Sequence, residues 1–376
     1  MIYLDNAATT LVKPKAVECA VLRAMQSCGN PGRSGHRAAM HAANIVFGCR
    51  ETVAELFELE DPTRVIFTQN ATHALNIAIQ SLLRNGGHAV VSGYEHNSVI
   101  RPLSALEERG VTYTIAHAPL FSPKAQIAAM ERSIRPETVC IICNHVSNVF
   151  GCVQDICAVN ALCKKYGLDL VLDLSQSAGI IPVSVKDLSE ATYLCMPGHK
   201  GLYGPQGTGI LICCKVGKHY SVIQGGTGSE SKNLRQPEAL PEGLESGTLN
   251  VPGIAGLREG VRFVMRKSCL AIDAWEKELK EYFLQKACNI PNIHVYYSHC
   301  SQCGVVSLTS KCCAPETLGA RLSEKGIALR SGLHCAPIAH ESAGTLPQGT
   351  LRISFSAFNT KAEIDKLCLW ILKTNS

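Results

Sequence analysis

The stretch Met196-Pro-Gly-His-Lys-Gly-Leu-Tyr-Gly-Pro-Gln-Gly-Thr-Gly209 places one lysine between an apolar segment and a glycine-rich turn. The apolar residues 191–196 predict a buried strand. The five glycines of the stretch let the backbone bend tightly and approach a ligand closely. A lysine at such a crowded strand end is partly desolvated, so it can lose its proton and attack a carbonyl carbon. Lys200 is therefore a candidate nucleophile, although the stretch alone also fits a solvated loop lysine.

Apolar segments of strand length recur through the middle of the chain, and the first five alternate with segments that have the apolar spacing of helices. The predicted strands cover residues 64–69, 88–93, 111–116, 138–146, 169–174, 191–196 and 208–214. This alternation predicts an α/β fold with a seven-stranded, mostly parallel sheet. The last two strands are joined by the glycine-rich turn, which leaves no room for a crossover helix, so we expect that pair to be antiparallel.

The chain is predicted to divide near Pro252-Gly253. We expect a large domain over residues 15–252, and a smaller α+β domain made of residues 1–14 and 253–376. The smaller domain should contain an amphipathic helix that breaks once, two strands and a closing helix, over residues 254–284, 305–309, 351–355 and 361–372. Pro14 opens a helix of the large domain, whose inward residues should be Val17, Val21, Ala24 and Met25.

Composition excludes several classes of protein. Hydrophobic residues make up 46% and charged residues 18% of 376, with a net charge of +5, which is ordinary for a globular chain. The basic residues form no run, so we expect no nucleic-acid partner. The longest apolar runs are too short for a membrane span of roughly 20 residues. The N-terminal residues show no secretory signal, so we expect a cytoplasmic protein without membrane attachment.

Nineteen cysteines are unusual for a chain of this kind. Most lie within apolar segments, where a reduced cysteine behaves as a small hydrophobe, and this usage predicts a reducing compartment. We expect no metal site. An alternative stays open, because Cys300, Cys303, Cys312 and Cys313 have a spacing that loosely fits a four-thiolate zinc site.

Polar residues follow several of the predicted strands. Ala71 and Thr72 begin a helix directly after the first strand, where free N–H groups and the helix dipole attract an anion. Thr72 as a plain N-cap is the alternative. Asp173 ends the fifth strand, where a buried acid needs a partner such as a protonated pyridine nitrogen or a core arginine. His96 follows the second strand and is placed to stack on a flat ring or to shuttle a proton.

The C-terminal part carries a second group of candidates in Arg330-Ser-Gly-Leu-His-Cys335. A partly exposed thiol near positive charge can ionise and act as a nucleophile, so Cys335 is a candidate, although it is also one cysteine among nineteen. Arg352 suits a bidentate grip on a carboxylate. The reactive lysine and the acid suited to a pyridine nitrogen together point to pyridoxal phosphate, which enzymes hold as a Schiff base.

The chain resembles the class V aminotransferase superfamily, and within it the cysteine desulfurase / selenocysteine lyase family. The resemblance extends over nearly the whole chain, and its motifs occur in the family's order. They are Tyr3-Leu-Asp-Asn-Ala-Ala-Thr-Thr10, Glu95-His96, Asp173-Leu-Ser-Gln176, Gly198-His-Lys200, Tyr203-Gly-Pro205 and Glu245-Ser-Gly-Thr248. This resemblance implies pyridoxal phosphate fold type I and a homodimer.

The resemblance also implies roles for individual residues. Lys200 is the Schiff-base lysine, Asp173 the pyridinium partner, Gln176 the contact of the phenolic oxygen and His96 the ring-stacking acid/base. Thr72, with the helix start at Ala71, and His199 bind phosphate, and Thr248 does so from the other subunit. Asn148 and Arg352, together with Arg330, bind the substrate. One departure is Pro197, because many relatives have a serine there that donates to the phosphate.

The function implied is conversion of L-cysteine to L-alanine, with sulfur passed to Cys335 as a persulfide. The surroundings of Cys335 are similar to the second desulfurase group, which usually hands the persulfide to an acceptor protein. A selenocysteine lyase is the first alternative, since a selenolate leaves more easily and depends less on Cys335. A class V aminotransferase, which needs no such thiol, and a non-catalytic scaffold are the others. His340 and Glu341 match no family motif that we can assign.

Overall fold

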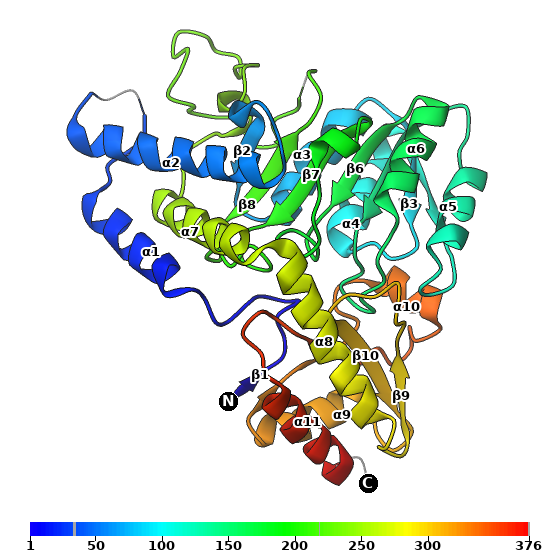
Figure 1. The fold of residues 1–376 in the computed structure, drawn as a ribbon. Coiled ribbons are helices and arrows are strands. Elements are labelled where there is room, and N and C mark those ends of the chain that lie inside the picture. The colour runs from blue at the N-terminus through cyan, green and yellow to red at the C-terminus, as the bar shows by residue number, and fades with distance from the viewer. Residues whose placement is uncertain (33–34, 218, 375–376) are drawn as a thin grey trace.

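The computed structural model describes residues 1–32, 35–217 and 219–374, and its centre is a seven-stranded sheet (Figure 1). The strand order is β2-β8-β7-β6-β5-β3-β4. Only β8 runs antiparallel to its neighbours, as expected for a strand joined to β7 by the glycine-rich turn. The strands are β2 (Val65–Thr68), β3 (Gly87–Ser92), β4 (Val111–Ala116), β5 (Thr138–Asn144), β6 (Asp169–Asp173), β7 (Ala191–Pro197) and β8 (Gly209–Cys213). All seven predicted strands are confirmed.

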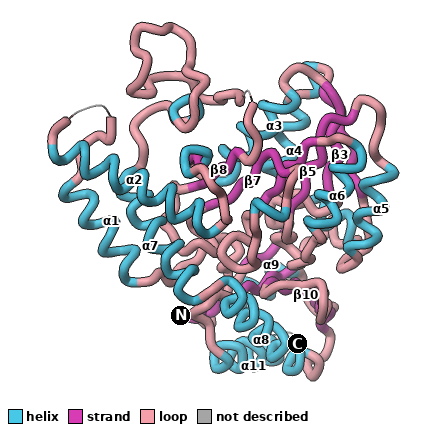
Figure 2. Tube along the Cα trace, turned by 45° about the horizontal axis from the view of Figure 1, so that its top comes forward, coloured by secondary structure: helices cyan, strands magenta, loops and turns pink. Residues whose placement is uncertain are grey.

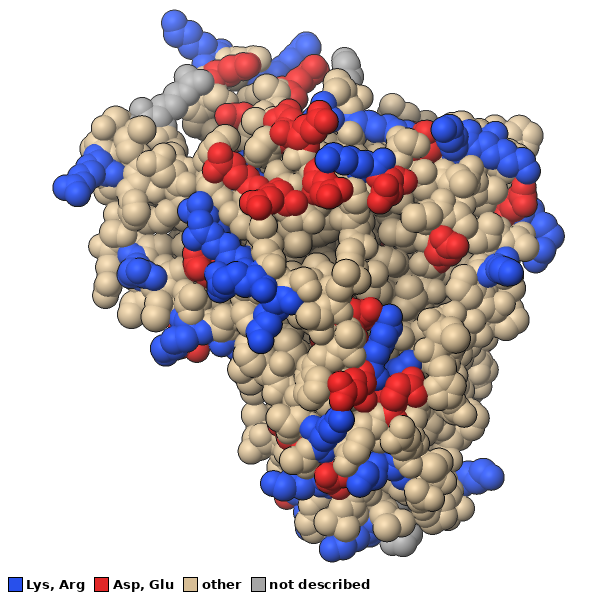
Figure 3. All heavy atoms as spheres, in the orientation of Figure 1, with Lys and Arg blue, Asp and Glu red and all other residues tan. Residues whose placement is uncertain are grey.

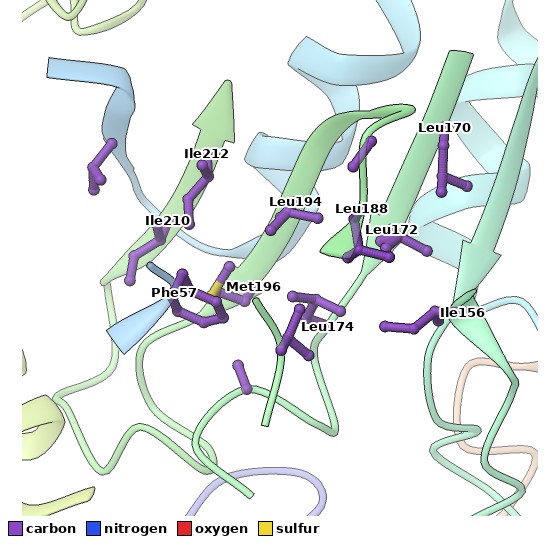
Figure 4. Close-up of a cluster of buried hydrophobic side chains, with 14 of the residues drawn as sticks. Phe57, Ile156, Leu170, Leu172, Leu174, Leu188, Leu194, Met196, Ile210 and Ile212 are labelled. Atoms are coloured by element: carbon purple, nitrogen blue, oxygen red, sulfur yellow. The ribbon is translucent and has the colours of Figure 1, made fainter. Parts of the chain in front are cut away.

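Helices cover both faces of this sheet, which explains why its strands are continuous apolar runs. One face packs against α2 (Arg37–Leu56), α5 (Pro123–Arg132), α6 (Ile156–Tyr166) and α7 (Val251–Lys267). In Figure 4, Leu194 and Met196 of β7 lie beside Ile210 and Ile212 of β8 on that face. The other face packs against α3 (Ala71–Leu83) and α4 (Asn97–Ala105). Figure 2 shows the sheet between the two helical layers.

A second, four-stranded antiparallel sheet has the order β12-β13-β10-β9. Its core is closed by apolar side chains of three helices. The strands are β9 (Ile293–Tyr296), β10 (Val305–Ser310), β12 (Arg330–Gly332) and β13 (Thr350–Ser354), and the helices are α8 (Cys269–Ala287), α9 (Pro315–Glu324) and α11 (Lys361–Thr374). The predicted break in the long amphipathic segment is confirmed, because α7 ends before Ser268 and α8 begins after it.

The N-terminal segment joins the two sheets. β1 (Ile2–Tyr3) pairs in parallel with β11 (Ile327–Ala328), which follows α9. Beyond β1, the Thr10 amide donates to the His199 carbonyl at 3.1 Å, so the same segment reaches the turn that carries Lys200. The segment then enters α1 (Lys15–Ser27), which packs against α7. The predicted division of the chain into residues 15–252, 1–14 and 253–376 stays a prediction.

Two sequence expectations need correction or find no support. Met25 does not point inward, because its side chain is 68% exposed, and the buried face of α1 is carried by Val17 and Ala24. The four-thiolate alternative fails, because Cys303 is buried while Cys300 and Cys312 are exposed. Within the described ranges, no group of three or more His, Cys, Asp or Glu side chains could hold a metal ion.

The described surface carries charged side chains of both signs. On the face shown in Figure 3, a short row of lysine and arginine side chains crosses the region of α7, acidic side chains gather above it, and elsewhere the two signs are mixed. Among the described residues, every helix is too short or too polar to cross a bilayer.

Candidate functional site

A cavity of about 190 Å³ opens where the carboxyl ends of the parallel strands meet the second sheet. Such a sheet edge is the usual ligand site of open α/β sheets. All but one of the residues singled out from the sequence line this cavity: Ala71, Thr72, His96, Asn148, Asp173, Gln176, His199, Lys200, Arg330, Cys335 and Arg352. These residues span 281 positions of the sequence, from Ala71 to Arg352, so only the fold brings them together.

Lys200 follows β7 and is half-buried at one wall of the cavity. Burial lowers the pKa of its amine to about 8, because desolvation disfavours the ammonium form, and the nearby Asp173 carboxylate opposes this shift only in part. The turn that carries Lys200 is packed tightly against the chain, since a Cβ on Gly201 would lie 2.4 Å from the Ala178 carbonyl oxygen. Gly201 thus allows another segment of the protein, rather than a ligand, to approach the turn closely. A fraction of Lys200 is neutral near pH 8 and available as a nucleophile.

Asp173 lies at the end of β6 and is 4% exposed. Its Oδ1 accepts a hydrogen bond from the Ser175 amide at 2.8 Å, and within the described residues it forms no ion pair, so the core-arginine alternative fails. Burial raises the pKa of this carboxyl, while the Ser175 hydrogen bond and Lys200 lower it. A buried acid without a counter-ion, facing a cavity, is suited to a cationic group of a ligand.

His96 precedes α4 and caps it. Its Nδ1 accepts the Ser98 amide hydrogen at 3.0 Å and also lies 2.7 Å from the Ser98 hydroxyl. Because Nδ1 accepts the amide hydrogen, the neutral ring carries its proton on Nε2. Burial lowers the pKa of His96 to about 4, helped by the positive charges of Lys200 and Arg330. The ring is therefore neutral at physiological pH and can donate through Nε2.

The beginning of α3 has the free amides that an anion site requires. Asn70 caps the helix, since its side chain accepts the His73 amide hydrogen at 2.9 Å. Thr72 is therefore not the N-cap, and the amides of Ala71 and Thr72 are left for a ligand. Gly209 permits this arrangement, because a Cβ there would lie 2.5 Å from the Asn70 carbonyl carbon.

Three further residues bear on phosphate binding. His199 lines the cavity, and its buried Nδ1 has no hydrogen-bond partner. Pro197 also lines the cavity and offers no hydroxyl. Thr248 is the exception among the predicted residues: it lies between β8 and α7 and lines a separate cavity with Gln69 and Asn250.

Cys335 is exposed on the loop after β12, at the side of the cavity formed by the second sheet. It and His334 adopt positive φ angles of 58° and 50°, which side-chain-bearing residues rarely do. Two hydrogen bonds hold this loop: the Asn97 amide donates to the Cys335 carbonyl at 2.8 Å, and Asn148 Nδ2 donates to the His334 carbonyl at 2.8 Å. The loop carrying the thiol is thus tied to the helix that His96 caps.

The two arginines differ in their surroundings. Arg352 is 2% exposed, and its Nη1 donates to the Asn148 carbonyl at 2.9 Å. Its Nη2 pairs with Asp5 Oδ1 at 2.6 Å, and its buried Nε has no partner. Arg330 lies opposite Arg352 in the β12–β13 register and is exposed at the cavity. The site thus presents two guanidinium groups, one of which already has a counter-ion.

Several contributors were not assigned a role from the sequence. Asp5 pairs with Arg352, and Ser98 fixes the ring of His96. Glu95 is fully buried, its Oε1 accepts the Asn144 amide hydrogen at 2.7 Å, and burial raises its pKa to about 8. An asparagine directly before a helix with periodic apolar residues is a recognisable capping signal, so the role of Asn70 could have been predicted from the sequence. The others depend on contacts between distant segments.

The residues present fit pyridoxal phosphate. The cavity offers a nucleophilic amine at Lys200, an unpaired buried acid at Asp173, and free amides at the start of α3 with the orphaned His199 Nδ1 beside them. These match the aldehyde, the protonated ring nitrogen and the phosphate of that cofactor. Gln176 Nε2 donates to the Ala7 carbonyl at 3.0 Å, which leaves its second N–H for the phenolic oxygen.

Comparison with known proteins shows the family of this chain. The aminotransferase class-V family model matches residues 2–367. A probable cysteine desulfurase of Methanothermobacter thermautotrophicus is 30% identical over 97% of this chain and 92% of the relative. The cysteine desulfurase IscS of an Enterobacter species is 28% identical over 97% of this chain and 90% of its own. A longer probable cysteine desulfurase, from Mycolicibacterium paratuberculosis, is 28% identical, and the chain spans 54% of its length.

Solved structures show the same fold. The apo cysteine desulfurase of Thermococcus onnurineus superposes with a TM-score of 0.91 at 27% identity, covering 100% of this chain and 94% of that one. The cysteine desulfurase CsdA of Escherichia coli gives a TM-score of 0.86 at 25% identity, covering 99% and 94%. The resemblance read from the sequence motifs is confirmed, and the protein belongs to the aminotransferase class-V family.

Proposed function

We propose that the protein is a pyridoxal phosphate-dependent cysteine desulfurase, which converts L-cysteine to L-alanine and transfers the sulfur to Cys335 as a persulfide. One observation carries the proposal: Lys200, whose pKa is lowered by burial, and Cys335, which has an exposed thiol, line a single cavity. A class V aminotransferase needs the lysine but not the thiol. The relatives named cysteine desulfurases support the same choice.

The cofactor would be held by residues from four strand ends. Lys200 would bond its aldehyde, Asp173 its ring nitrogen, His96 would stack on the ring, and the amides of Ala71 and Thr72 would bind its phosphate. When bound, pyridoxal phosphate supplies an electron sink that makes the substrate Cα–H bond acidic. Because Asp173 is buried without a counter-ion, pairing with a protonated ring nitrogen stabilises both charges.

The substrate carboxylate would be bound by Arg352 with Asn148 and Arg330. The unpartnered atoms Arg352 Nε and Asn148 Oδ1 are buried and lie in residues that line the cavity. Nε is a donor suited to the carboxylate, and Asn148 Oδ1 is an acceptor suited to the substrate ammonium. This places the substrate between the Lys200 side and the Cys335 side of the cavity.

Sulfur transfer would then be carried out by Cys335 as its thiolate. Its sulfur forms an S–S bond to the substrate sulfur while the substrate Cβ–S bond breaks. The electron pair of the broken bond stays on Cβ, which takes up a proton and becomes the methyl group of alanine. Lys200 accepts and returns protons at its amine, and His96 can donate through Nε2. No external oxidant is needed, because the substrate sulfur is oxidised as its carbon is reduced.

A homodimer is part of the proposal. Thr248 lies away from the cavity of its own chain, so it can contribute to a phosphate site only from a partner subunit. Large apolar side chains are exposed on α1 and α2: Leu22, Met25, Met40 and Phe47. Phe47 and Thr248 line one cavity of about 690 Å³. The exposed apolar surface and the threonine proposed to bind phosphate therefore lie in one region. A second copy of this chain would cover both.

An acceptor protein would take the sulfur onward. Cys335 is exposed, so a persulfide there can be reached by the thiol of another protein. All nineteen cysteines are free thiols, including several buried in the sheet core. This fits the cytoplasm, where thiols stay reduced.

The test is release of alanine from L-cysteine and from L-selenocysteine by the wild type, Cys335→Ala and Cys300→Ala. Cys300 is a matched control, because it is also an exposed loop cysteine but does not line the cavity. A desulfurase loses cysteine turnover only in Cys335→Ala, and mass spectrometry finds the persulfide on Cys335. If selenocysteine is turned over strongly and cysteine hardly at all, and the mutation changes neither, the protein is a selenium enzyme instead.

A further inference from the structure

Asp5 belongs to the N-terminal motif, yet no step of the proposed reaction uses it. The backbone fixes its position: Asp5 forms an isolated bridge with Ser354, and the Ser354 amide donates to the Leu4 carbonyl at 2.8 Å. Arg352 precedes Ser354 by two positions on β13, so both lie on the same face of that strand. The N-terminal segment therefore places the Asp5 carboxylate beside the Arg352 guanidinium.

The contact between the two side chains is a close ion pair. Arg352 Nη2 lies 2.6 Å from Asp5 Oδ1, with the guanidinium 2% and the carboxylate 19% exposed. Burial lowers the pKa of Arg352, and the charge of Asp5 opposes that shift. Nη1 donates to the Asn148 carbonyl, and Nε is the one N–H-bearing atom of this guanidinium left without a partner among the described residues. A ligand carboxylate that uses Nε must also use Nη2 to be gripped by two parallel bonds.

Asp5 and the ligand carboxylate thus meet the same guanidinium. Around it, Arg330 and Lys200 supply positive charge at the cavity, and Asp173 is the carboxylate that lines it. Two anions that share one buried cation weaken each other's binding, because their mutual repulsion is poorly screened away from water.

We propose that Asp5 is a positioning and specificity-determining residue: it is the resident counter-ion of Arg352 and competes with the α-carboxylate of substrate and product for that guanidinium. The inference rests on the proposed function, in which Arg352 binds this carboxylate. Cysteine and alanine carry the same carboxylate, so an Arg352 without a counter-ion would hold the product as firmly as the substrate. Asp5 keeps the affinity for both low enough for alanine to leave.

The experiment is calorimetric titration of the holoenzyme with 3-mercaptopropionate. This probe has the thiol and the carboxylate of cysteine but no amino group, so it cannot replace Lys200 on the cofactor. Asp5→Asn keeps an oxygen acceptor for Nη2 and removes the charge. We expect it to lower the Kd of the probe about tenfold, as removal of a nearby like charge should. Asp5→Glu, which keeps the charge, should bind less tightly than Asp5→Asn, and the neutral 3-mercaptopropanol should bind all three proteins equally.

The direction of the change separates this role from a structural one. If Asp5 only holds Arg352 in place, Asp5→Asn binds the probe equally or more weakly, and the proposal is overturned. In turnover, the proposal requires a lower KM for cysteine in Asp5→Asn, whereas loss of an anchor raises KM. If Asp5→Asn does not fold, Asp5→Ser removes the same charge and is judged by the same criterion. A wild-type holoenzyme that does not bind the probe at all contradicts the carboxylate site of the proposed function, and with it the role of Asp5.

Discussion

At the scale of single residues, the site combines groups whose pKa values are moved by burial. Lys200 is brought to about 8 and His96 to about 4, and desolvation is the largest cause for both. The lysine is therefore partly neutral under physiological conditions and the histidine almost entirely so. A neutral amine and a neutral imidazole can exchange protons with a substrate without first exchanging a proton with the solvent.

The pH dependence of cofactor capture follows from the Lys200 pKa. Only the neutral amine attacks the aldehyde, so the rate at which the apoprotein gains the visible absorbance of the bound cofactor should rise with pH and level off above about 8. Stopped-flow absorbance at a series of pH values measures this. The midpoint of an ordinary lysine would lie near 10.5.

Two variants control this prediction. Asp173 raises the pKa of Lys200, so Asp173→Asn should move the midpoint to lower pH. Lys200→Arg should give no covalent product, and borohydride reduction followed by mass spectrometry should find no modified peptide. A modified peptide in Lys200→Arg would show that another amine is the attachment point.

At the residue scale, sequence patterns located side chains of the cavity where a polar residue follows a strand. Lys200 and Asp173 each follow a continuous apolar run, and such runs are readable because both faces of the sheet are covered. The pair Asp5–Arg352 was not readable, because it joins residues 347 positions apart that belong to different segments. The sequence pointed to Arg352 as a carboxylate ligand but gave no sign of its counter-ion.

At the scale of elements, the start of α3 is where local capping and ligand binding meet. Asn70 satisfies the His73 amide, which leaves the preceding amides of the helix for an anion. The geometry of the proposed phosphate site thus depends on Asn70, which the proposal does not make a ligand of the phosphate.

Removal of this cap should affect both stability and cofactor binding. Asn70→Ala should lower the free energy of unfolding by about 1 kcal/mol, the usual value of an N-cap, and should also weaken retention of pyridoxal phosphate. Chemical denaturation of the apoprotein and dialysis of the holoenzyme measure the two effects. Asp155 is the equivalent cap of α6: its side chain accepts the Ala158 amide hydrogen at 2.9 Å, and it does not line the cavity. The control variant is therefore Asp155→Ala. It should lose stability but retain the cofactor.

Element prediction failed where the pattern was less regular than a buried strand. The apolar residues of α1 are spread around the helix, so Met25 was assigned to the wrong face. β9 is an edge strand with half-buried and exposed residues, and it carries no continuous apolar run. β12 has only three residues and contains a glycine, so it is too short for periodicity to show.

At the scale of the whole molecule, the exposed apolar surface of α1 and α2 is the feature that a monomer does not explain. Phe47 is 48% exposed and lines a cavity with Thr248. If a second copy covers this surface, then subunit association and phosphate binding are linked, because the partner supplies Thr248.

A charge on this surface should therefore separate the subunits. Phe47→Glu should shift the protein toward monomer in analytical ultracentrifugation, and it should lose the cofactor more readily. Leu270→Glu is the matched control, since Leu270 is 69% exposed on α8 but does not line the cavity shared by Phe47 and Thr248, and it should leave the association state unchanged. A wild-type protein that sediments as a monomer at micromolar concentration would falsify the homodimer.

The N-terminal segment has a consequence for how the molecule is made. Ile2–Tyr3 finds its strand partner only at Ile327–Ala328, and Asp5 finds Arg352 only 347 residues later. On a ribosome, the strands of the central sheet emerge as one contiguous stretch and can fold first, as domains generally do during synthesis. The nascent chain would then carry its lysine in place long before the thiol and the guanidinium exist. If Cys335 accepts sulfur as proposed, sulfur transfer is thereby withheld until the second sheet has been synthesised and has folded.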